Sequence, residues 1–329
     1  MVPDNSECDR RAKDRFGATI PRELVHRRAI SEVLLTGIHT SGNAVYTVSA
    51  QWPRWHVFFG SVRHGFDSAL VVETLRQLTV LVAHTQLNVP LGMQFLMPDM
   101  SVSMAPGALQ DPSRPAEVTV EVVVTDIRAA VQGVTAFRTS AIFFVDGQRI
   151  AAGTAGARIV TPEAYNRIRS HRGVAVGCRM GRPVPAAEVG HLSPWNVVLN
   201  ESSDTGHWPL RVDVSNPILF DHPLDHVPGV LLIEAVRQAV RLAFRDPCLD
   251  FLTVEAQFVS IAEFSDEATV VLESVSDGPE PAIVHASIQA AGRVRMQARI
   301  TAKRLVSTGI HQWKSVGTER SALRENLHA

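Results

Sequence analysis

A glutamate, an arginine and a glutamine recur with one spacing at two places in this chain. The two copies are Glu73–Arg76–Gln77 and Glu234–Arg237–Gln238. At i, i+3 and i+4, a carboxylate, a guanidinium and an amide project from one face of a helix. The flanking residues are Leu, Val, Ile and Ala, so the polar group lies on a helix that is otherwise suited to burial. Because burying a charge is costly unless it is paired or used, each triad is a candidate site.

The composition is that of an ordinary globular protein. The chain has 329 residues, 45% hydrophobic residues and a formal net charge of −1, which predicts about two domains of ~150 residues and no general attraction to nucleic acid or membranes. Cys8, Cys178 and Cys248 form no CxxC pair or disulfide framework, which is typical of a reducing cytoplasm. The polar N-terminal segment has no signal-peptide core, and no apolar run is long enough to span a bilayer. We therefore expect a cytoplasmic protein.

Each half of the chain shows the same order of expected elements: two strands, a loop rich in His, Asp and Gly, the helix with its triad, and three strand-like segments. In the first half these are strands 31–37 and 45–52, loop 56–69, helix 68–86, and strands 92–104, 117–128 and 134–160 with a hairpin turn at Asp146–Gly147. In the second half they are strands 195–201 and 210–215, loop 217–229, helix 229–245, and strands 251–263, 268–276 and 282–305. The repeat predicts two α+β units, each with one helix against an antiparallel sheet.

The boundaries follow from composition. We expect a flexible leader at 1–22, a first domain at 23–161, a linker rich in Pro and Gly at 162–190, a second domain at 191–305 and a polar tail at 306–329.

The loop before the second helix carries the groups best suited to chemistry. Pro228 and Gly229 begin the helix, so that the free N–H groups of Gly229 and Val230 can point at a carbonyl oxygen. Glu234 follows further along, and we expect burial to raise its pKa towards the range of a general base or acid. No Ser or Cys nucleophile motif is visible, which favours direct transfer without a covalent intermediate.

Two families resemble this region. Pro228–Gly229 followed by Glu234 resembles the β-hydroxyacyl-ACP dehydratases, whose catalytic glutamate lies six residues after the proline. The position of their histidine is occupied here by Phe220, with His222 and His226 nearby, and an arginine replaces a small residue after the glutamate. These departures argue against dehydration.

A closer resemblance covers both halves. GFDSALVVETLRQ at 65–77, together with DHPLDHVPGVLLIEAVRQA at 221–239, is similar to the A-factor biosynthesis (AfsA-type) family of tandem hotdog enzymes. It implies an α+β double hotdog fold, with two antiparallel sheets each wrapped on a central helix as a pseudo-dimer in one chain. It also implies an acyltransferase that joins a β-ketoacyl chain, carried on acyl carrier protein, to the hydroxyl of dihydroxyacetone phosphate. A butenolide phosphate, the precursor of a γ-butyrolactone-type signalling molecule, follows.

The resemblance assigns site residues by position. It implies that Glu73, Glu234 and Arg237 are catalytic, with no cofactor and no metal, and it leaves a homodimer open. A phosphorylated acceptor needs a cation with fixed geometry, which Arg237 or Arg76 supplies, and Glu234 is the expected base. The expected substrate-binding residues are Arg76, Gln77, Gln238, His222, Asp225, His226, Gly229, His64, Asp67 and Ser68.

Several alternatives stay open at this point. The triads could be intrahelical ion pairs repeated by gene duplication, and the Asp221–His222 and Asp225–His226 pairs could bind a metal or form turns and caps. The basic segment 164–187 could dock an acidic carrier protein or be a solvated linker. A hotdog thioesterase or hydratase/dehydratase acting on acyl-ACP or acyl-CoA, and a non-catalytic binding scaffold, are the competing functions.

Overall fold

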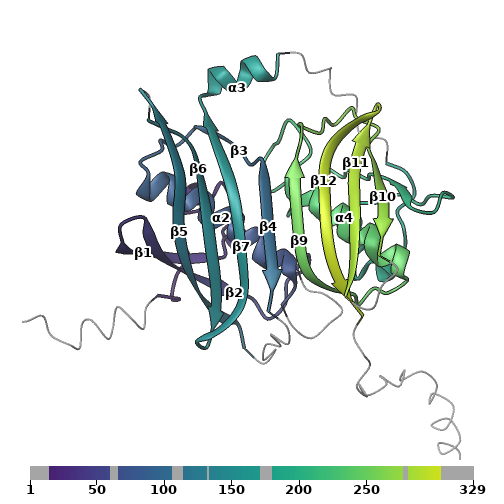
Figure 1. Ribbon diagram of the computed structural model, residues 1–329, viewed down its shortest axis with the longest axis horizontal. Coiled ribbons are helices and arrows are strands. Elements are labelled where there is room, and N and C mark those ends of the chain that lie inside the picture. Colours follow the sequence, from purple (N-terminus) through teal and green to yellow (C-terminus); the bar gives the residue numbers. More distant parts are fainter. Residues whose placement is uncertain are drawn as a thin grey trace, which may run out of the picture.

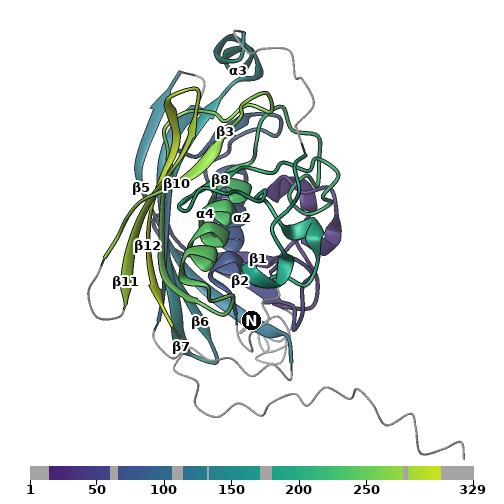
Figure 2. The ribbon, with the colours of Figure 1, turned by 90° about the vertical axis from the view of Figure 1, so that its right-hand side faces the viewer.

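The computed structural model describes residues 15–59, 66–105, 114–131, 133–170, 180–276 and 281–304. Two long helices, α2 (Ser68–Gln86) and α4 (Gly229–Phe244), lie against the same face of one large antiparallel sheet (Figures 1 and 2). Its 12 strands run in the order β1-β2-β5-β6-β7-β4-β9-β12-β11-β10-β8, with β3 paired to β7.

The first half contributes the longer strands. They are β1 (Leu35–Gly42), β2 (Val45–Trp52), β3 (Gln94–Leu96), β4 (Asp99–Met104), β5 (Ala116–Ala130), β6 (Gly133–Val145) and β7 (Gln148–Val160), preceded by the short 3-10 helices η1 (Arg22–Val25) and η2 (Ile30–Glu32). β6 and β7 are joined through Asp146 and Gly147, both at positive φ (50° and 74°). Two consecutive positive φ values match the twist of a two-residue hairpin, which confirms the turn predicted there.

The second half repeats the plan with shorter elements. They are α3 (Pro162–Ile168), η3 (Ala186–Val189), η4 (Pro194–Asn196), β8 (His207–Pro209), α4, β9 (Asp250–Phe258), β10 (Thr269–Val275), β11 (Ala282–Ala290) and β12 (Arg293–Lys303). The helix α3 and the 3-10 helix η3 lie within the segment predicted to be a linker. No helix in the described ranges combines the length and the apolar character needed to cross a membrane.

The two halves share one sheet because β4 pairs with β9, in a register that opposes Ser101 to Glu255 and Val102 to Val254. The two sheets expected from the sequence are therefore continuous, and both central helices cover one face of the joined sheet (Figure 2). α2 packs so closely on this face that a Cβ on Gly153 of β7 would lie 2.9 Å from Leu75 Cδ2. A larger residue at this position would require Leu75 to shift and would lie 3.0 Å from the Ser101 carbonyl oxygen.

The predicted helices agree with the structure to within a residue, but one predicted strand pair is wrong. Residues 195–201 and 210–215 form no strands, and Leu199 and Leu210 make only an isolated bridge. The reason is local: Pro194 begins a 3-10 turn capped by Ser193, and the amide of Val198 donates to the Gln238 side chain instead of to a neighbouring strand. The first predicted strand also begins late, at Leu35, because Ile30–Glu32 is a 3-10 helix.

Candidate active site

The first triad forms a buried charged cluster around Glu73, whose side chain is 1% exposed. Its Oε1 accepts from Arg27 Nη2 (2.7 Å), Arg76 Nη2 (2.8 Å) and Gln77 Nε2 (2.7 Å), and its Oε2 accepts from Arg76 Nε (2.9 Å). Gln77 ties the cluster to the chain before β1, since its amide donates to the Glu32 carbonyl and its oxygen accepts from the Leu34 amide. The three side chains therefore share one helix face, as the spacing predicts, and form a cluster of paired charges.

The second triad forms the matching cluster around Glu234. Its Oε1 accepts from Gln238 Nε2 (3.0 Å) and lies 2.8 Å from His191 Nε2, and its Oε2 accepts from Arg237. Gln238 is bound as Gln77 is, through the Asn196 carbonyl and the Val198 amide.

Both glutamates are held as carboxylates. Burial alone would raise the pKa of Glu73, but the charges of Arg27 and Arg76 and the hydrogen bonds from Arg76 and Gln77 lower it to about 2. Burial opposes ionisation of Glu234 in the same way, and Arg237 with His191 still lowers its pKa well below the usual range. The expectation that burial raises the pKa of Glu234 is therefore wrong, because the charges that surround the carboxylate outweigh its desolvation.

Each cluster is covered by the loop that precedes the other repeat's helix. Arg27 Nη1 donates to the Ile218 carbonyl (3.0 Å), in the loop before α4. Reciprocally, Arg237 binds Asp67 at the start of α2, and the rings of Phe58 and His191 lie 5.6 Å apart. The two sites thus lie between the repeats, as expected of a pseudo-dimer.

The two clusters differ in charge balance and access. In the second, Arg237 and Arg241, each 2% exposed, share the carboxylates of Glu234 and Asp67, and both guanidinium groups lie over the Phe251 ring, 4.8 and 4.9 Å from its centroid. This cluster is a closed, neutralised core.

The first cluster is more open. Arg76 is 18% exposed, and among the described residues no acceptor lies within hydrogen-bond distance of its Nη1. Glu73 alone of the described carboxylates hydrogen-bonds to it. Because Nη2 also donates to the Val25 carbonyl (3.3 Å), Nη1 is the nitrogen of Arg76 that stays available for an anion.

The two central helices also differ at their N-termini: that of α2 is capped and paired, and that of α4 is open. α2 is capped by its own Asp67, whose carboxylate accepts from the Ala69 amide (2.8 Å) and binds Arg237. α4 begins after Pro228 with no side-chain cap, and Gly229 and Val230 are only partly buried. Within the described part of the chain, no acceptor pairs with these two amides, so the α4 terminus can take an oxyanion.

The remaining predicted site residues fall into three groups. His222 is half-buried and contacts Asp221 beside the first cluster. Asp225 and His226 belong instead to a clamp with Tyr165 and Arg169, which ties α3 to the loop before α4. Ser68 is buried at the start of α2, and its hydroxyl has no partner in the described part of the chain. His64 lies outside the described residues.

Three site residues were missed by the sequence reasoning: Arg27, His191 and Arg241. Arg27 and His191 were placed in the predicted domains ahead of the first strand of each half, with no role assigned, yet they bind the two glutamates at equivalent places. A repeated Pro-x-x-x-Val, at Pro21–Val25 and Pro185–Val189, precedes each by two residues and could have revealed them.

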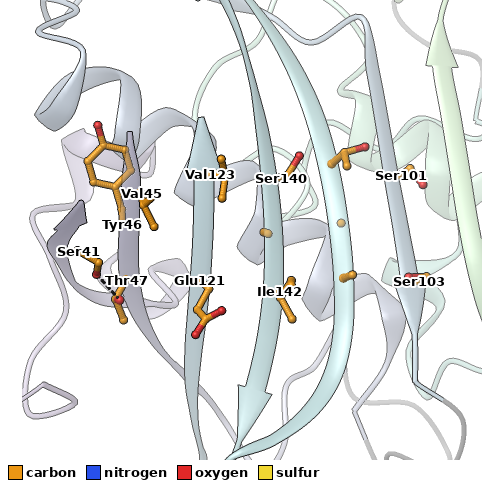
Figure 3. A pocket seen from close by; sticks show the side chains of 14 residues that line it. Ser41, Val45, Tyr46, Thr47, Ser101, Ser103, Glu121, Val123, Ser140 and Ile142 are labelled. Atoms are coloured by element: carbon orange, nitrogen blue, oxygen red, sulfur yellow. Dashed lines mark hydrogen bonds between the residues drawn. The ribbon is translucent and has the colours of Figure 1, made fainter. Parts of the chain in front are cut away.

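A shallow groove lies on the other face of the sheet (Figure 3). It is lined by outward-facing side chains such as Ser101, Ser140, Glu121 and Val123, and includes none of the predicted site residues. The candidate site is thus confined to the helix face of the sheet. No group of three or more His, Cys, Asp or Glu side chains in the described ranges could hold a metal ion.

Comparisons with known proteins identify the family of this chain. The model of the A-factor biosynthesis hotdog domain (AfsA) matches residues 8–161 and 179–305. A 2-oxo-3-(phosphooxy)propyl 3-oxoalkanoate synthase of Streptomyces virginiae is 39% identical over 249 residues, which are 75% of this chain and 84% of that protein. A protein of the same name from Streptomyces coelicolor is 34% identical over 286 residues, 85% of this chain and 89% of that protein. Among solved structures, a putative oleoyl thioesterase from Lactobacillus plantarum has a TM-score of 0.49 and 12% identity, covering 81% of this chain and 98% of that chain. The chain belongs to the AfsA family of A-factor biosynthesis proteins.

Proposed function

We propose that this chain is an acyltransferase that joins a β-ketoacyl group, delivered as a thioester on acyl carrier protein, to the hydroxyl of dihydroxyacetone phosphate. The ester then cyclises to the butenolide phosphate precursor of a γ-butyrolactone-type signalling molecule. The names of the two Streptomyces relatives support both halves of the product, a 3-oxoalkanoate and a phosphooxypropyl group. Because acyl carrier protein is the donor, the cytoplasm is the expected place of action.

The observation that carries the proposal is the Nη1 group of Arg76. A guanidinium held in a fixed orientation binds phosphate well. Among the described residues nothing accepts from Arg76 Nη1, while Glu73 and the Val25 carbonyl hold Nε and Nη2 in place. In this scheme the amides of Gly229 and Val230 stabilise the oxyanion that forms when the hydroxyl attacks the thioester carbonyl. Glu73 acts as the anchor of the two arginines.

Glu234 and Arg237 have the matching role in the closed cluster. Their guanidinium–carboxylate network reaches Asp67 and so fixes the first turn of α2, the helix that carries Glu73 and Arg76. The three residues predicted to be catalytic therefore have different roles in this scheme: Glu73 lines the site, whereas Glu234 and Arg237 position it.

Mass spectrometry of products tests the proposal directly. The full chain is incubated with β-ketoacyl-ACP and either dihydroxyacetone phosphate, unphosphorylated dihydroxyacetone or no acceptor. We expect the phosphorylated ester or butenolide only with dihydroxyacetone phosphate. Free β-keto acid formed at one rate in all three mixtures would contradict acyl transfer and favour the thioesterase function.

Arg76→Ala tests the phosphate contact. Losing a hydrogen bond to a charged group costs about 1.5–3 kcal/mol, so kcat/KM with dihydroxyacetone phosphate should fall ~10- to 150-fold. Activity with the unphosphorylated acceptor should change little. Arg299→Ala is the matched control, because Arg299 forms an exposed ion pair with Glu255 (2.8 Å). An equal loss with both acceptors would remove Arg76 from phosphate binding.

A further inference from the structure

The loop before α4 carries an Asp–His pair, Asp221 and His222, for which the scheme above has no use. Asp221 is 1% exposed, and its carboxylate accepts from the backbone amides of Arg28 (2.6 Å) and Ala29 (2.8 Å). These amides follow Arg27, the residue that binds Glu73. The pair is therefore anchored to the chain that builds the open cluster.

The two ring nitrogens of His222 have different surroundings. Nδ1 is buried, has no hydrogen-bond partner among the residues that the structure describes, and lies 3.6 Å from Asp221 Oδ2. The side chain as a whole is 35% exposed, and among the described residues Nε2 has no partner. A shift of about 0.5 Å closes the Asp221 contact, and catalytic hydrogen bonds of this kind are often long before substrate binds. The carboxylate then holds the proton on Nδ1 and leaves the Nε2 lone pair free.

The other candidate bases of this site are occupied. Both oxygens of Glu73 accept hydrogen bonds from arginine, and its pKa is lowered to about 2. His26 has a 2.9 Å contact from its Nε2 to His84 Nε2, and burial with the charges of His84 and Arg76 lowers its pKa to about 4. Each would be a weak proton acceptor.

The groups that face His222 keep its imidazole neutral. Burial lowers its pKa, Asp221 on the same loop raises it, and the positive charges of Arg76 on α2 and Arg27 after η1 lower it further. His26, also after η1, is a further titratable neighbour. At pH 7 the ring is therefore in the form that accepts a proton.

We propose that His222, positioned by Asp221, is the general base of the acyl transfer, an inference that rests on the proposed function. His222 Nε2 takes the proton of the acceptor hydroxyl as the oxygen attacks the thioester carbonyl. The new C–O bond forms, the C–S bond breaks, and the imidazolium returns the proton to the departing thiolate, giving ester and free thiol. No oxidant, reductant or further reactant is needed.

The test compares the wild type with His222→Gln and a control, His207→Gln. His207 is a 47% exposed histidine that contacts Asp204 (3.2 Å) on the edge strand β8. A lost general base lowers the rate by about 10²-fold or more. We expect this loss of kcat in His222→Gln, a normal rate in His207→Gln and unchanged urea midpoints in both. In the wild type, kcat/KM should show an acidic limb displaced to the acidic side of about 6.5, the ordinary histidine value, because the pKa of His222 is lowered. This limb should be absent from the residual activity of His222→Gln.

The outcomes separate the two proposals. If the wild type forms no ester with dihydroxyacetone phosphate, the proposed function fails. If the wild type forms ester but His222→Gln keeps more than about a tenth of its kcat, or keeps the acidic limb, the base assignment is wrong. A wild-type kcat/KM with no acidic limb at any pH where the chain stays folded overturns the assignment without any variant, which covers the case in which His222→Gln does not fold.

Discussion

Removing Arg237 should destabilise the fold far more than removing its counterpart Arg76. In Arg237→Ala, two buried carboxylates lose a guanidinium that is 2% exposed: Glu234 keeps His191 at 2.8 Å, and Asp67 keeps Arg241 at 3.4 Å. Breaking a buried pair by removing one partner costs about 3–5 kcal/mol. The remaining partners place this variant towards the lower end, near ~3 kcal/mol.

Arg76→Ala should cost less because its carboxylate stays better paired. Glu73 retains Arg27 and Gln77, each at 2.7 Å, and Arg76 is partly exposed, so we expect a loss of about 1–2 kcal/mol. Arg299→Ala, from an exposed pair, sets the baseline at ~0–1 kcal/mol.

Equilibrium urea unfolding at pH 7 measures the stability change of all three variants, as a shift in the urea midpoint at constant m-value. Activity assayed where Arg237→Ala is folded should keep the wild-type preference for dihydroxyacetone phosphate. The reasoning is refuted if Arg76→Ala is the more destabilising change, or if Arg237→Ala unfolds normally yet loses only the phosphorylated acceptor. The second result would return phosphate binding to Arg237.

Two further predictions follow from the same site. The pKa of Glu73, ordinarily 4.5, is lowered to about 2 in the folded chain, and the pKa of Glu234 is lowered as well. A carboxylate with a lowered folded-state pKa contributes stability that is complete above pH ~4.5 and is lost as the pH falls towards 2. The urea midpoint should therefore drop between pH 5 and 3, and Glu73→Gln should flatten that drop; an unchanged slope would contradict the pairing. Gly229→Ala places a Cβ 2.9 Å from Phe258 Cε1, so the ring or the first turn of α4 must move, and we expect kcat to fall by about 10-fold or more through the loss of one oxyanion donor. Replacing the Phe258 ring with a smaller side chain, in the double variant Gly229→Ala/Phe258→Leu, should restore activity. A fully active Gly229→Ala would show that these amides do not contact the reacting carbonyl.

The parts of the fold that could be predicted are those set by local pattern. The limits of α2 and α4 follow from apolar runs that come directly after Asp67 and Pro228. The β6–β7 hairpin follows from Asp146–Gly147, a dipeptide that tolerates positive φ. The segment at 195–201 was not predictable in this way. Its apolar residues suit a strand, but the Val198 amide and the Asn196 carbonyl are taken by the Gln238 side chain of α4. Tertiary contacts overrode the local preference there.

The sequence by itself determined that two carboxylate–guanidinium–amide triads would lie on two equivalent buried helices, because side-chain spacing on a helix is a local property. Only the tertiary structure decided what each triad does. Asp67 reaches Arg237 from 170 residues away in the chain and neutralises one cluster, whereas the equivalent place before α4 is Pro228, which has no charge to offer Arg76. The sign of the Glu234 pKa shift depends in the same way on His191 and Arg237. Electrostatic energy depends on distance in space and on exclusion of water, and neither is set until the two halves have packed together.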